Sequence, residues 1–342
     1  KTAAGQTAFD LIRRAANKLL SFSDAGAGCV FGNLYKGIPS PNTGEPGWSL
    51  SLIDPSTSYP VQLGFVVAFH VLPVIIFISS LLAILYHIGL MQRIVAGFAW
   101  MMRRTMKISG AESLAAAANI FVGNVESPLA VRPYIEKMTM SELALIMTSG
   151  FATVAGSVMA TYIRFGVDAG HLLTASIMSA PAAVVIAKLI FPETAVAETA
   201  DTTGIRIKAE TTNILDAAAS GAFQGLKIAA TVGAMLIAFL SLVAMINYLL
   251  GFAGTSLDQL FGYLFSPIAF CMGVDRGDAL QVGALLGTKV AINEFVGYLD
   301  LIALKDQISD RSFIIATYAL CGFANFGSIG IALGGIGQIA PG

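Results

Sequence analysis

The feature that most constrains the fold is the apolar run over residues 61–89, VQLGFVVAFHVLPVIIFISSLLAILYHIG. About 20 apolar residues suffice for a helix to cross the hydrocarbon core of a bilayer. Pro73 lies inside the run and predicts a kink. Comparable runs recur along the chain, which is 56% hydrophobic and only 12% charged, whereas soluble domains carry about a quarter charged residues. The sequence therefore predicts an all-α polytopic membrane protein.

The composition also argues against other classes. The net charge of −1 provides no basic face for nucleic acid. The three cysteines, Cys29, Cys271 and Cys321, are far apart, lack metal-binding spacing, and are expected to be packed hydrophobes. The segment GALLGTKV has the wrong spacing for a P-loop, and neither H-E-x-x-H nor G-x-S-x-G occurs. No enzyme is expected.

Composition shifts divide the chain into six expected segments. In order, these are an amphipathic interfacial helix (1–22), an extramembrane connection (23–59), a transmembrane span with an interfacial helix (60–107), a first repeat (108–191), a loop with a span and an interfacial helix (192–274), and a second repeat (275–342). The basic cluster MMRRTMK, residues 101–107, predicts the cytoplasmic side. Both ends of the chain resemble interior points of a longer protein, so truncation at both ends is expected.

Two segments, 111–138 and 278–304, are too apolar for loops, yet polar residues interrupt each of them. We interpret both as re-entrant helical hairpins, whose tips are tolerated only where protein or a water-filled cavity covers them. Each interruption contains a carboxylate, Glu126 in the first and Glu294 in the second. A charge at the bilayer centre costs roughly 2.5–3.5 kcal/mol. Both carboxylates therefore need partners.

Each hairpin is followed by a span that glycines interrupt, and the two spans share a motif. GFATVAGS begins at Gly150, and GFANFGS begins 172 residues later at Gly322; the two hairpin carboxylates are 168 residues apart. Three expected spans, 141–163, 171–191 and 226–252, separate the hairpins. An odd number of crossings predicts an inverted repeat, and paired interrupted helices indicate the binding site of a secondary transporter.

The polar residues at the interruptions allow two interpretations. In the first, the carboxylates only cap half-helices or pair with Lys289. In the second, they accept hydrogen bonds from a polar solute or help to hold a cation. The neighbouring oxygens would form a neutral pocket suited to a polyhydroxylated solute and a hard cation such as sodium; they belong to Asn119, Asn124, Thr153, Asn293, Asn325 and Ser328.

Three motifs carry a family resemblance. GTKVAINEFVGY (287–298) resembles the signature segment of the concentrative nucleoside transporters, NIFVGNVESPLAVRPY (119–134) their first hairpin, and CGFANFGSIGIALGG (321–335) their late interrupted helix. ESPLAVRP is similar to the sodium-coupled members rather than the proton-coupled ones. The resemblance implies a homotrimer in the cell membrane, with two re-entrant hairpins in a transport domain that moves as an elevator.

The resemblance also implies the site residues. Those for the nucleoside are Asn124, Val125, Glu126, Val158, Glu294, Phe323, Asn325 and Ser328, and those for sodium are Asn119, Val122, Thr153 and Val154. Glu294, Asn325 and Ser328 would hold the ribose hydroxyls. Asn124 and Val125 replace the family's usual glutamine and threonine, so base recognition is expected to differ and the preferred base stays open.

The sequence thus predicts a transporter that imports nucleosides with sodium by alternating access. A proton-coupled transporter, a passive pore and a binding-only receptor remain as alternatives. The lipid bilayer and a nucleoside are the expected partners, together with two further copies of the chain. Short loops and an alanine-rich composition favour a bacterial inner membrane.

Overall fold

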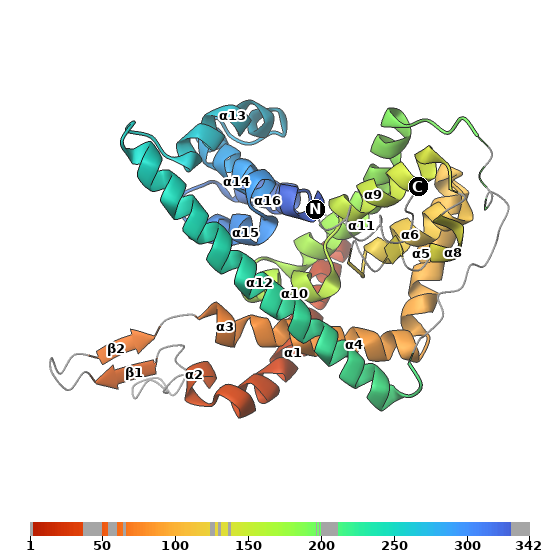
Figure 1. Cartoon of the computed structure of the whole chain (residues 1–342), viewed down its shortest axis with the longest axis horizontal. Coiled ribbons are helices and arrows are strands. Elements are labelled where there is room, and N and C mark those ends of the chain that lie inside the picture. Colours follow the sequence, from red (N-terminus) through yellow and green to blue (C-terminus); the bar gives the residue numbers. More distant parts are fainter. Residues whose placement is uncertain are drawn as a thin grey trace.

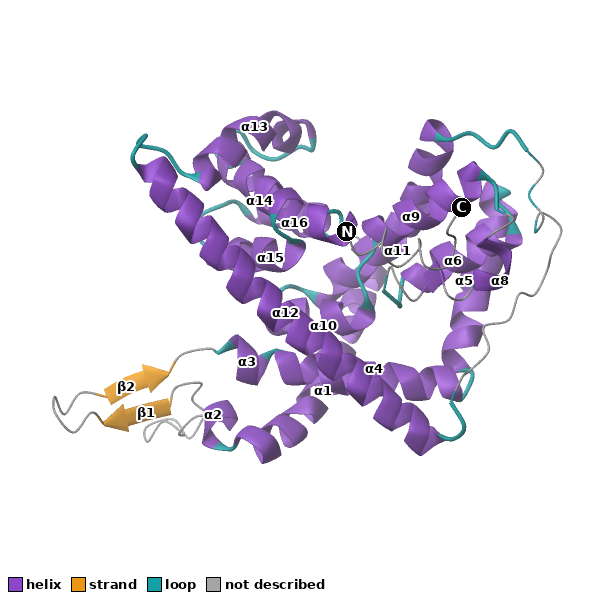
Figure 2. Ribbon diagram, viewed as in Figure 1, coloured by secondary structure: helices purple, strands orange, loops and turns teal. Residues whose placement is uncertain are grey.

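The protein is described by a computed structural model over residues 3–36, 50–53, 60–63, 66–123, 127–128, 131–135, 138–195, 197, 199 and 211–329. Across these residues the chain is helical except for one two-stranded antiparallel sheet and the connecting loops (Figure 2). The prediction of a mostly helical chain is confirmed.

The elements follow one another along the chain as shown in Figure 1. They are α1 (Ala3–Phe31), α2 (Asn33–Lys36), β1 (Leu50–Ile53), β2 (Pro60–Leu63), α3 (Val67–His70), α4 (Leu72–His87), α5 (Leu90–Met106), α6 (Gly110–Asn119), α8 (Arg132–Ile135), α9 (Met140–Ala152), α10 (Gly156–Arg164), α11 (Ala169–Ile190), α12 (Ile214–Gly251), α13 (Leu257–Cys271), α14 (Ala279–Ala291), α15 (Glu294–Ala303) and α16 (Asp310–Leu320).

Within the described part of the chain, four stretches are long and apolar enough to cross a membrane. They are Val67–His87, Met140–Arg164, Ala169–Ile190 and Ile214–Gly251, which correspond to four of the predicted spans. The fifth predicted span is the interrupted one that contains Gly322; it covers 313–339 and extends beyond the described residues. Helix α12, with 38 residues, is about 57 Å long. In Figure 1 it runs diagonally: its earlier half crosses α4, and its later half lies beside the group α13 to α16.

Helix α12 contacts α4 through glycines. A Cβ atom added to Gly221 would lie 2.7 Å from the carbonyl oxygen of Ser79, and one added to Gly225 would lie 2.7 Å from the Cα atom of Ile76. Small residues at this spacing let two apolar helices approach backbone to backbone, which is the usual packing of helices in lipid.

The second predicted hairpin consists of two helices, α14 and α15, separated by Ile292 and Asn293. Asn293 is extended, with φ −168°, and its Oδ1 accepts a hydrogen bond from the backbone N–H of Val296 at 2.9 Å. This cap satisfies one of the exposed N–H groups of α15 and starts the helix at Glu294. Helix α13 packs along α14, where a Cβ atom on Gly283 would meet the backbone of Ser266 at 2.7 Å.

The first predicted hairpin begins with α6. Ser109 and Glu112 form a capping box at its start, which accounts for its first turn. Helix α6 ends at Asn119, and a turn leads to Gly123. Ser127 then donates a hydrogen bond from Oγ to the carbonyl oxygen of Ala115 at 2.7 Å. The chain has therefore returned alongside α6.

Each of the two interrupted helices has its break at the repeated motif. Helices α9 and α10 are separated by Thr153 to Ala155, and α16 ends before Cys321. Gly322 has φ +109°, and a Cβ atom there would lie 2.7 Å from the carbonyl oxygen of Phe151. The two breaks thus contact each other directly, and Gly322 is required both for its backbone conformation and for the close approach.

The start of α6 and the start of α14 are each hydrogen-bonded to the start of the interrupted helix that follows, α9 and α16 respectively. Ser109 donates from Oγ to Oε1 of Glu142 at 2.6 Å. In the second half, Ser309 donates from Oγ to Oδ2 of Asp278 at 2.9 Å. Hydrogen bonds from Ser312 and from the Ser309 backbone hold the pKa of Asp278 below its ordinary value. The same type of contact recurs at matching places in the two halves.

Buried side chains form two main clusters. The larger is centred on Tyr162, Tyr298 and Leu301 and joins α10, α11 and α14 to α16. The smaller includes Leu145 and Ile120 and joins α5, α6, α9 and α11. Helix α11 contributes to both clusters and so links the two halves.

The structure corrects several local predictions. Helix α1 continues beyond residue 22 to Phe31, because 23–31 contain no proline, and it ends at Gly32, whose φ is +53°. The connection predicted over 23–59 and the start of the run at residue 61 contain the strands β1 and β2, in which Leu50 pairs with Leu63. The first span therefore begins at Val67. The first interruption, expected at Gly150 and Gly156, lies at residues 153–155, so Gly156 is at the break and Gly150 remains inside α9.

Candidate functional site

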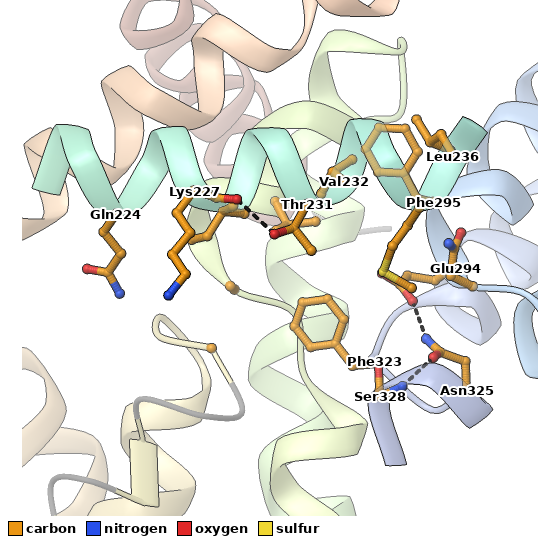
Figure 3. A pocket seen from close by; sticks show the side chains of 16 residues that line it. Gln224, Lys227, Thr231, Val232, Leu236, Glu294, Phe295, Phe323, Asn325 and Ser328 are labelled. Carbon is orange, nitrogen blue, oxygen red and sulfur yellow. Dashed lines mark hydrogen bonds between the residues drawn. The ribbon is translucent and has the colours of Figure 1, made fainter. Parts of the chain in front are cut away.

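A cavity of about 500 Å³ lies between α12 and the breaks of the second half of the chain (Figure 3). Helix α12 forms one wall, and the other is formed by α15 and the residues after α16, together with Gly123, Ala155 and Val158 of the first half. The lining residues are Gly123, Ala155, Val158, Gln224, Lys227, Ile228, Thr231, Val232, Met235, Leu236, Asn293, Glu294, Phe295, Phe323, Asn325 and Ser328. Five of the eight residues expected to contact a nucleoside are thus present together.

Glu294 is the central polar residue of this cavity. It is the first residue of α15 and only 5% exposed. A carboxylate is stabilised at that position by the partial positive charge of the helix N-terminus. Its Oε1 accepts a hydrogen bond from the Tyr162 hydroxyl at 3.0 Å, and its Oε2 accepts one from Nδ2 of Asn325 at 2.9 Å. Both oxygens are therefore fixed in position.

Asn325 connects Glu294 to the interrupted helix that follows α16. While its Nδ2 donates to Glu294, its Oδ1 accepts a hydrogen bond from the backbone N–H of Ser328 at 2.7 Å. Asn325 and Ser328 are 4% and 8% exposed. Figure 3 shows this chain of hydrogen bonds at one end of the cavity. Its rigidity suits a ligand whose polar groups have a fixed spacing.

Lys289 does not hydrogen-bond to Glu294, which was one of the two roles that the first interpretation of the sequence allowed for the carboxylate. Its Nζ donates to the carbonyl oxygen of Ala319 at 2.9 Å and to that of Cys321 at 3.2 Å. These carbonyls lie at the C-terminal end of α16 and lack the partners that a continuous helix would supply. Lys289 therefore stabilises the interruption, and the carboxylate of Glu294 remains directed at the cavity.

The residues expected to bind sodium lie where α6 meets the first interruption. Asn119 is fully buried, its Nδ2 donates to Oγ of Ser149 at 2.9 Å, and its Oδ1 has no hydrogen-bond partner in the described structure. Thr153 donates from Oγ1 to the carbonyl oxygen of Ser149 at 2.9 Å. A buried oxygen without a partner costs free energy unless something binds it.

The backbone joins the other two candidate sodium ligands to this region. Gly156 donates its N–H to the carbonyl oxygen of Phe121 at 3.0 Å, which places the segment of Val154 beside that of Val122. Val154 is 1% exposed. No group of three or more His, Cys, Asp or Glu side chains suited to a metal ion occurs among the described residues. The neutral oxygens are of the kind that a hard monovalent cation takes, so these residues fit sodium.

Three of the predicted residues, Asn124, Val125 and Glu126, lie outside the described residues. The adjacent Gly123 does line the cavity, as does Val158, which is 6% exposed. Phe323 also lines it, and its ring is displayed toward the cavity in Figure 3.

Sequence reasoning missed Tyr162, Ser149 and the face of α12. Tyr162 bonds to a residue 132 positions away, which no local pattern indicates. Ser149 lies one helical turn before Thr153, and a pair of hydroxyl residues at that spacing before a break was an available signal. On α12, polar residues at positions 224, 227 and 231 lie on one face of a mostly apolar helix, at spacings of three and four.

Family models and individual relatives both match this chain to nucleoside transporters. A model described as "Na+ dependent nucleoside transporter C-terminus" matches residues 171–342, and one described as "Nucleoside recognition" matches residues 68–169. The chain is 40% identical to mouse solute carrier family 28 member 3, covering all of this chain and 48% of the relative. It is 42% identical to the uncharacterized transporter YutK of Bacillus subtilis, covering all of this chain and 80% of the relative. The chain spans about half the length of the mammalian relatives it matches.

Solved structures agree with the fold. The inward-facing, substrate-bound structure of CNTnw superposes with a TM-score of 0.87 at 39% identity, over 99% of this chain and 79% of that one. A CNTnw variant in an outward-facing state gives 0.88 at 38% identity, with the same coverage of both chains. Similar scores for different states mean that the likeness identifies the fold and not the state. On these matches the chain belongs to the family of Na⁺-dependent nucleoside transporters, which are transporters and not enzymes.

Proposed function

We propose that the chain forms the transport core of a sodium-coupled nucleoside importer. The observation that carries the proposal is the buried carboxylate of Glu294, held by Tyr162 and Asn325 in a cavity of about 500 Å³. A carboxylate fixed by donors on one side still has lone pairs for the hydroxyls of a sugar. The ribose is placed on Glu294, Asn325 and Ser328, and the base lies near Phe323 and Val158.

Residues of the first hairpin complete the proposed substrate site. Asn124, Val125 and Glu126 are assigned to the base end, in keeping with the presence of Gly123 in the cavity lining. Asn119, Val122, Thr153 and Val154 are assigned to sodium. The unpartnered Oδ1 of Asn119 supports this second assignment.

Transport is proposed to occur by an elevator motion. Helix α6 with the segment that returns beside it, and the pair α14–α15, are taken as re-entrant hairpins that move, with the interrupted helices, past α12 and α4. The interlocked glycine contacts between α12 and α4 suit a fixed frame. The frame is proposed to assemble as a homotrimer in a bacterial inner membrane, with the two halves of the chain in inverted orientation.

The inward movement of one sodium ion releases enough free energy to accumulate a nucleoside against its gradient. One sodium ion moving inward gains about 2.3 kcal/mol per 100 mV. Since about 1.36 kcal/mol corresponds to a factor of ten, this supports roughly 50-fold accumulation before any sodium concentration gradient is added.

Uptake of labelled uridine and adenosine into proteoliposomes tests the proposal. An inward sodium gradient should drive accumulation, whereas choline in place of sodium should not. Accumulation driven by a proton gradient alone would favour the proton-coupled alternative. Equilibration without accumulation under every gradient would favour a pore, and tight binding without flux would favour a receptor.

A further inference from the structure

One face of α12 presents a polar stripe to the cavity. Gln224, Lys227 and Thr231 follow one another at spacings of three and four residues, and all three line the cavity. Residues at these spacings lie on the same side of a helix. This stripe faces the wall that carries Glu294, so a solute in the cavity lies between the two.

Lys227 is the charged member of the stripe. Its side chain is exposed to the cavity, and its ammonium has no hydrogen-bond or ion-pair partner within the described structure; only its backbone carbonyl is engaged, by Oγ1 of Thr231 at 2.9 Å. It lies within the candidate span Ile214–Gly251. Lys227 is the second residue of the predicted span 226–252. An ionisable residue of a membrane helix that faces a cavity marks the path of a substrate or an ion.

The geometry places Lys227 and Glu294 toward opposite ends of the cavity. In Figure 3 Lys227 projects from α12 into the cavity toward the end opposite Glu294, and the Phe323 ring lies between them in this view. Leu236, the lining residue of α12 nearest the other end, lies nine positions after Lys227, which is about 14 Å along the helix axis. In the arrangement of the two walls seen here, a nucleoside whose ribose lies on Glu294 directs its base toward Lys227.

We propose that Lys227 is a specificity-determining residue that donates a hydrogen bond to an exocyclic oxygen of the base. The transporter then prefers nucleosides of oxo bases, such as uridine and inosine, over their amino counterparts, cytidine and adenosine. This inference rests on the proposed function, because it takes the ribose as bound to Glu294.

The preference for oxo bases follows from the hydrogen-bonding groups of the lysine ammonium. A lysine ammonium has three donors and no acceptor. Uracil and hypoxanthine present an oxygen at the position where cytosine and adenine present an amino group. An amino group that faces the ammonium opposes one donor to another, so the hydrogen bond that an oxo base makes there is lost.

An anionic solute is the competing candidate for an unpartnered cation. In a nucleotide, however, the phosphate is attached to the ribose, and with the ribose on Glu294 it would stand close to a carboxylate of the same sign. A nucleotide is thus disfavoured in this pose, and uridine 5′-monophosphate becomes an informative competitor.

Equilibrium binding to the purified chain in detergent, with sodium present, tests the inference. The measured quantities are the dissociation constants of uridine, cytidine, inosine and adenosine. Uridine should bind about tenfold more tightly than cytidine, and inosine about tenfold more tightly than adenosine, which corresponds to about 1.4 kcal/mol for each pair.

Three variants test whether the hydrogen-bond donors of Lys227 cause the preference. Lys227→Met keeps the length of the side chain and removes the donors, so both ratios should fall to about one. Lys227→Arg keeps donors and should retain the preference. Lys305→Met removes an exposed lysine from the turn after α15 and should leave both ratios unchanged.

Each other outcome has a definite meaning. Equal affinities in the unmodified chain overturn the inference even if Lys227→Met does not fold. A preference that persists in Lys227→Met also overturns it. Uridine 5′-monophosphate binding more tightly than uridine, with the difference lost in Lys227→Met, replaces it with a phosphate site. If none of the four nucleosides binds, the proposed function itself fails.

Discussion

Asn325 donates a hydrogen bond from Nδ2 to Oε2 of Glu294 at 2.9 Å, across 31 residues of sequence. This contact joins the start of α15 to the interrupted helix that follows α16. The Oδ1 of the same amide accepts from the backbone of Ser328. One asparagine therefore fixes both the carboxylate and the helix turn that the proposed ribose site requires.

Replacing Glu294 with glutamine should abolish transport without unfolding the protein. The amide keeps the size of the side chain but loses the charge, and it presents a donor where Tyr162 or Asn325 already donates. Hydrogen bonds to a charged group contribute about 1.5–3 kcal/mol each, so nucleoside affinity should fall about 100-fold. Binding and uptake of uridine provide the measurement. Asp306→Asn, in the turn after α15, is the control, and normal uptake by Glu294→Gln would refute the ribose role.

The hydroxyl of Thr153 should determine the apparent affinity for sodium. Thr153→Val keeps the shape of the side chain and removes the oxygen, whereas Thr153→Ser keeps the oxygen and removes only a methyl group. The sodium concentration needed for half-maximal uridine binding should rise about tenfold in Thr153→Val, as expected for the loss of one buried polar contact. It should stay near the original value in Thr153→Ser. Equal sodium dependence in the two variants would contradict the assignment.

Gly322 should tolerate alanine poorly. Its φ of +109° is unfavourable for an L residue, and the added Cβ would lie 2.7 Å from the carbonyl oxygen of Phe151. The expected loss is about 3 kcal/mol of stability. Gly254→Ala is a matched control, since Gly254 has φ +70° but nothing within 4 Å of an added Cβ; only the conformational cost of about 1 kcal/mol applies there. Unfolding temperatures in detergent compare the two, and equal losses would show that the two breaks do not contact each other.

Asp278 should contribute to the pH dependence of stability. Its folded-state pKa lies below the ordinary value of 3.8, because it accepts hydrogen bonds from Ser312 and Ser309. The stabilisation is therefore present above that ordinary value and is lost as the pH falls through the folded pKa. Asp278→Asn should lower the unfolding temperature at neutral pH and bring it closer to that of the unmodified chain in acid. A variant whose deficit is the same at every pH would exclude a role for the charge.

The features of the fold that the sequence predicts are those that local patterns determine. Long apolar runs located four of the spans. Polar interruptions located Glu294 and Asn325, because a carboxylate or an amide inside an apolar run is costly unless it has a partner. The repeated Gly-Phe-Ala motif indicated where the helices break. The strands β1 and β2 were missed because they are four residues long and lie among turn-forming residues.

The unpredictable part depends on contacts between distant segments. The hydroxyl of Tyr162 reaches Glu294 from α10, and Lys289 binds the carbonyls at the end of α16 instead of the nearby carboxylate. The sequence offers both partners to Lys289 and does not rank them. Lys227 is one polar residue in a long helix until the fold shows that it lines the same cavity as Glu294.

The most direct test of sodium-coupled nucleoside transport uses proteoliposomes with equal sodium concentrations on both sides and an imposed potential of about −100 mV inside. The chain should then accumulate labelled uridine above the external concentration, with a limit of roughly 50-fold if one net positive charge enters with each nucleoside. Replacing sodium with choline should remove the accumulation. An internal concentration that only reaches the external one, with sodium present and the potential maintained, would contradict the account.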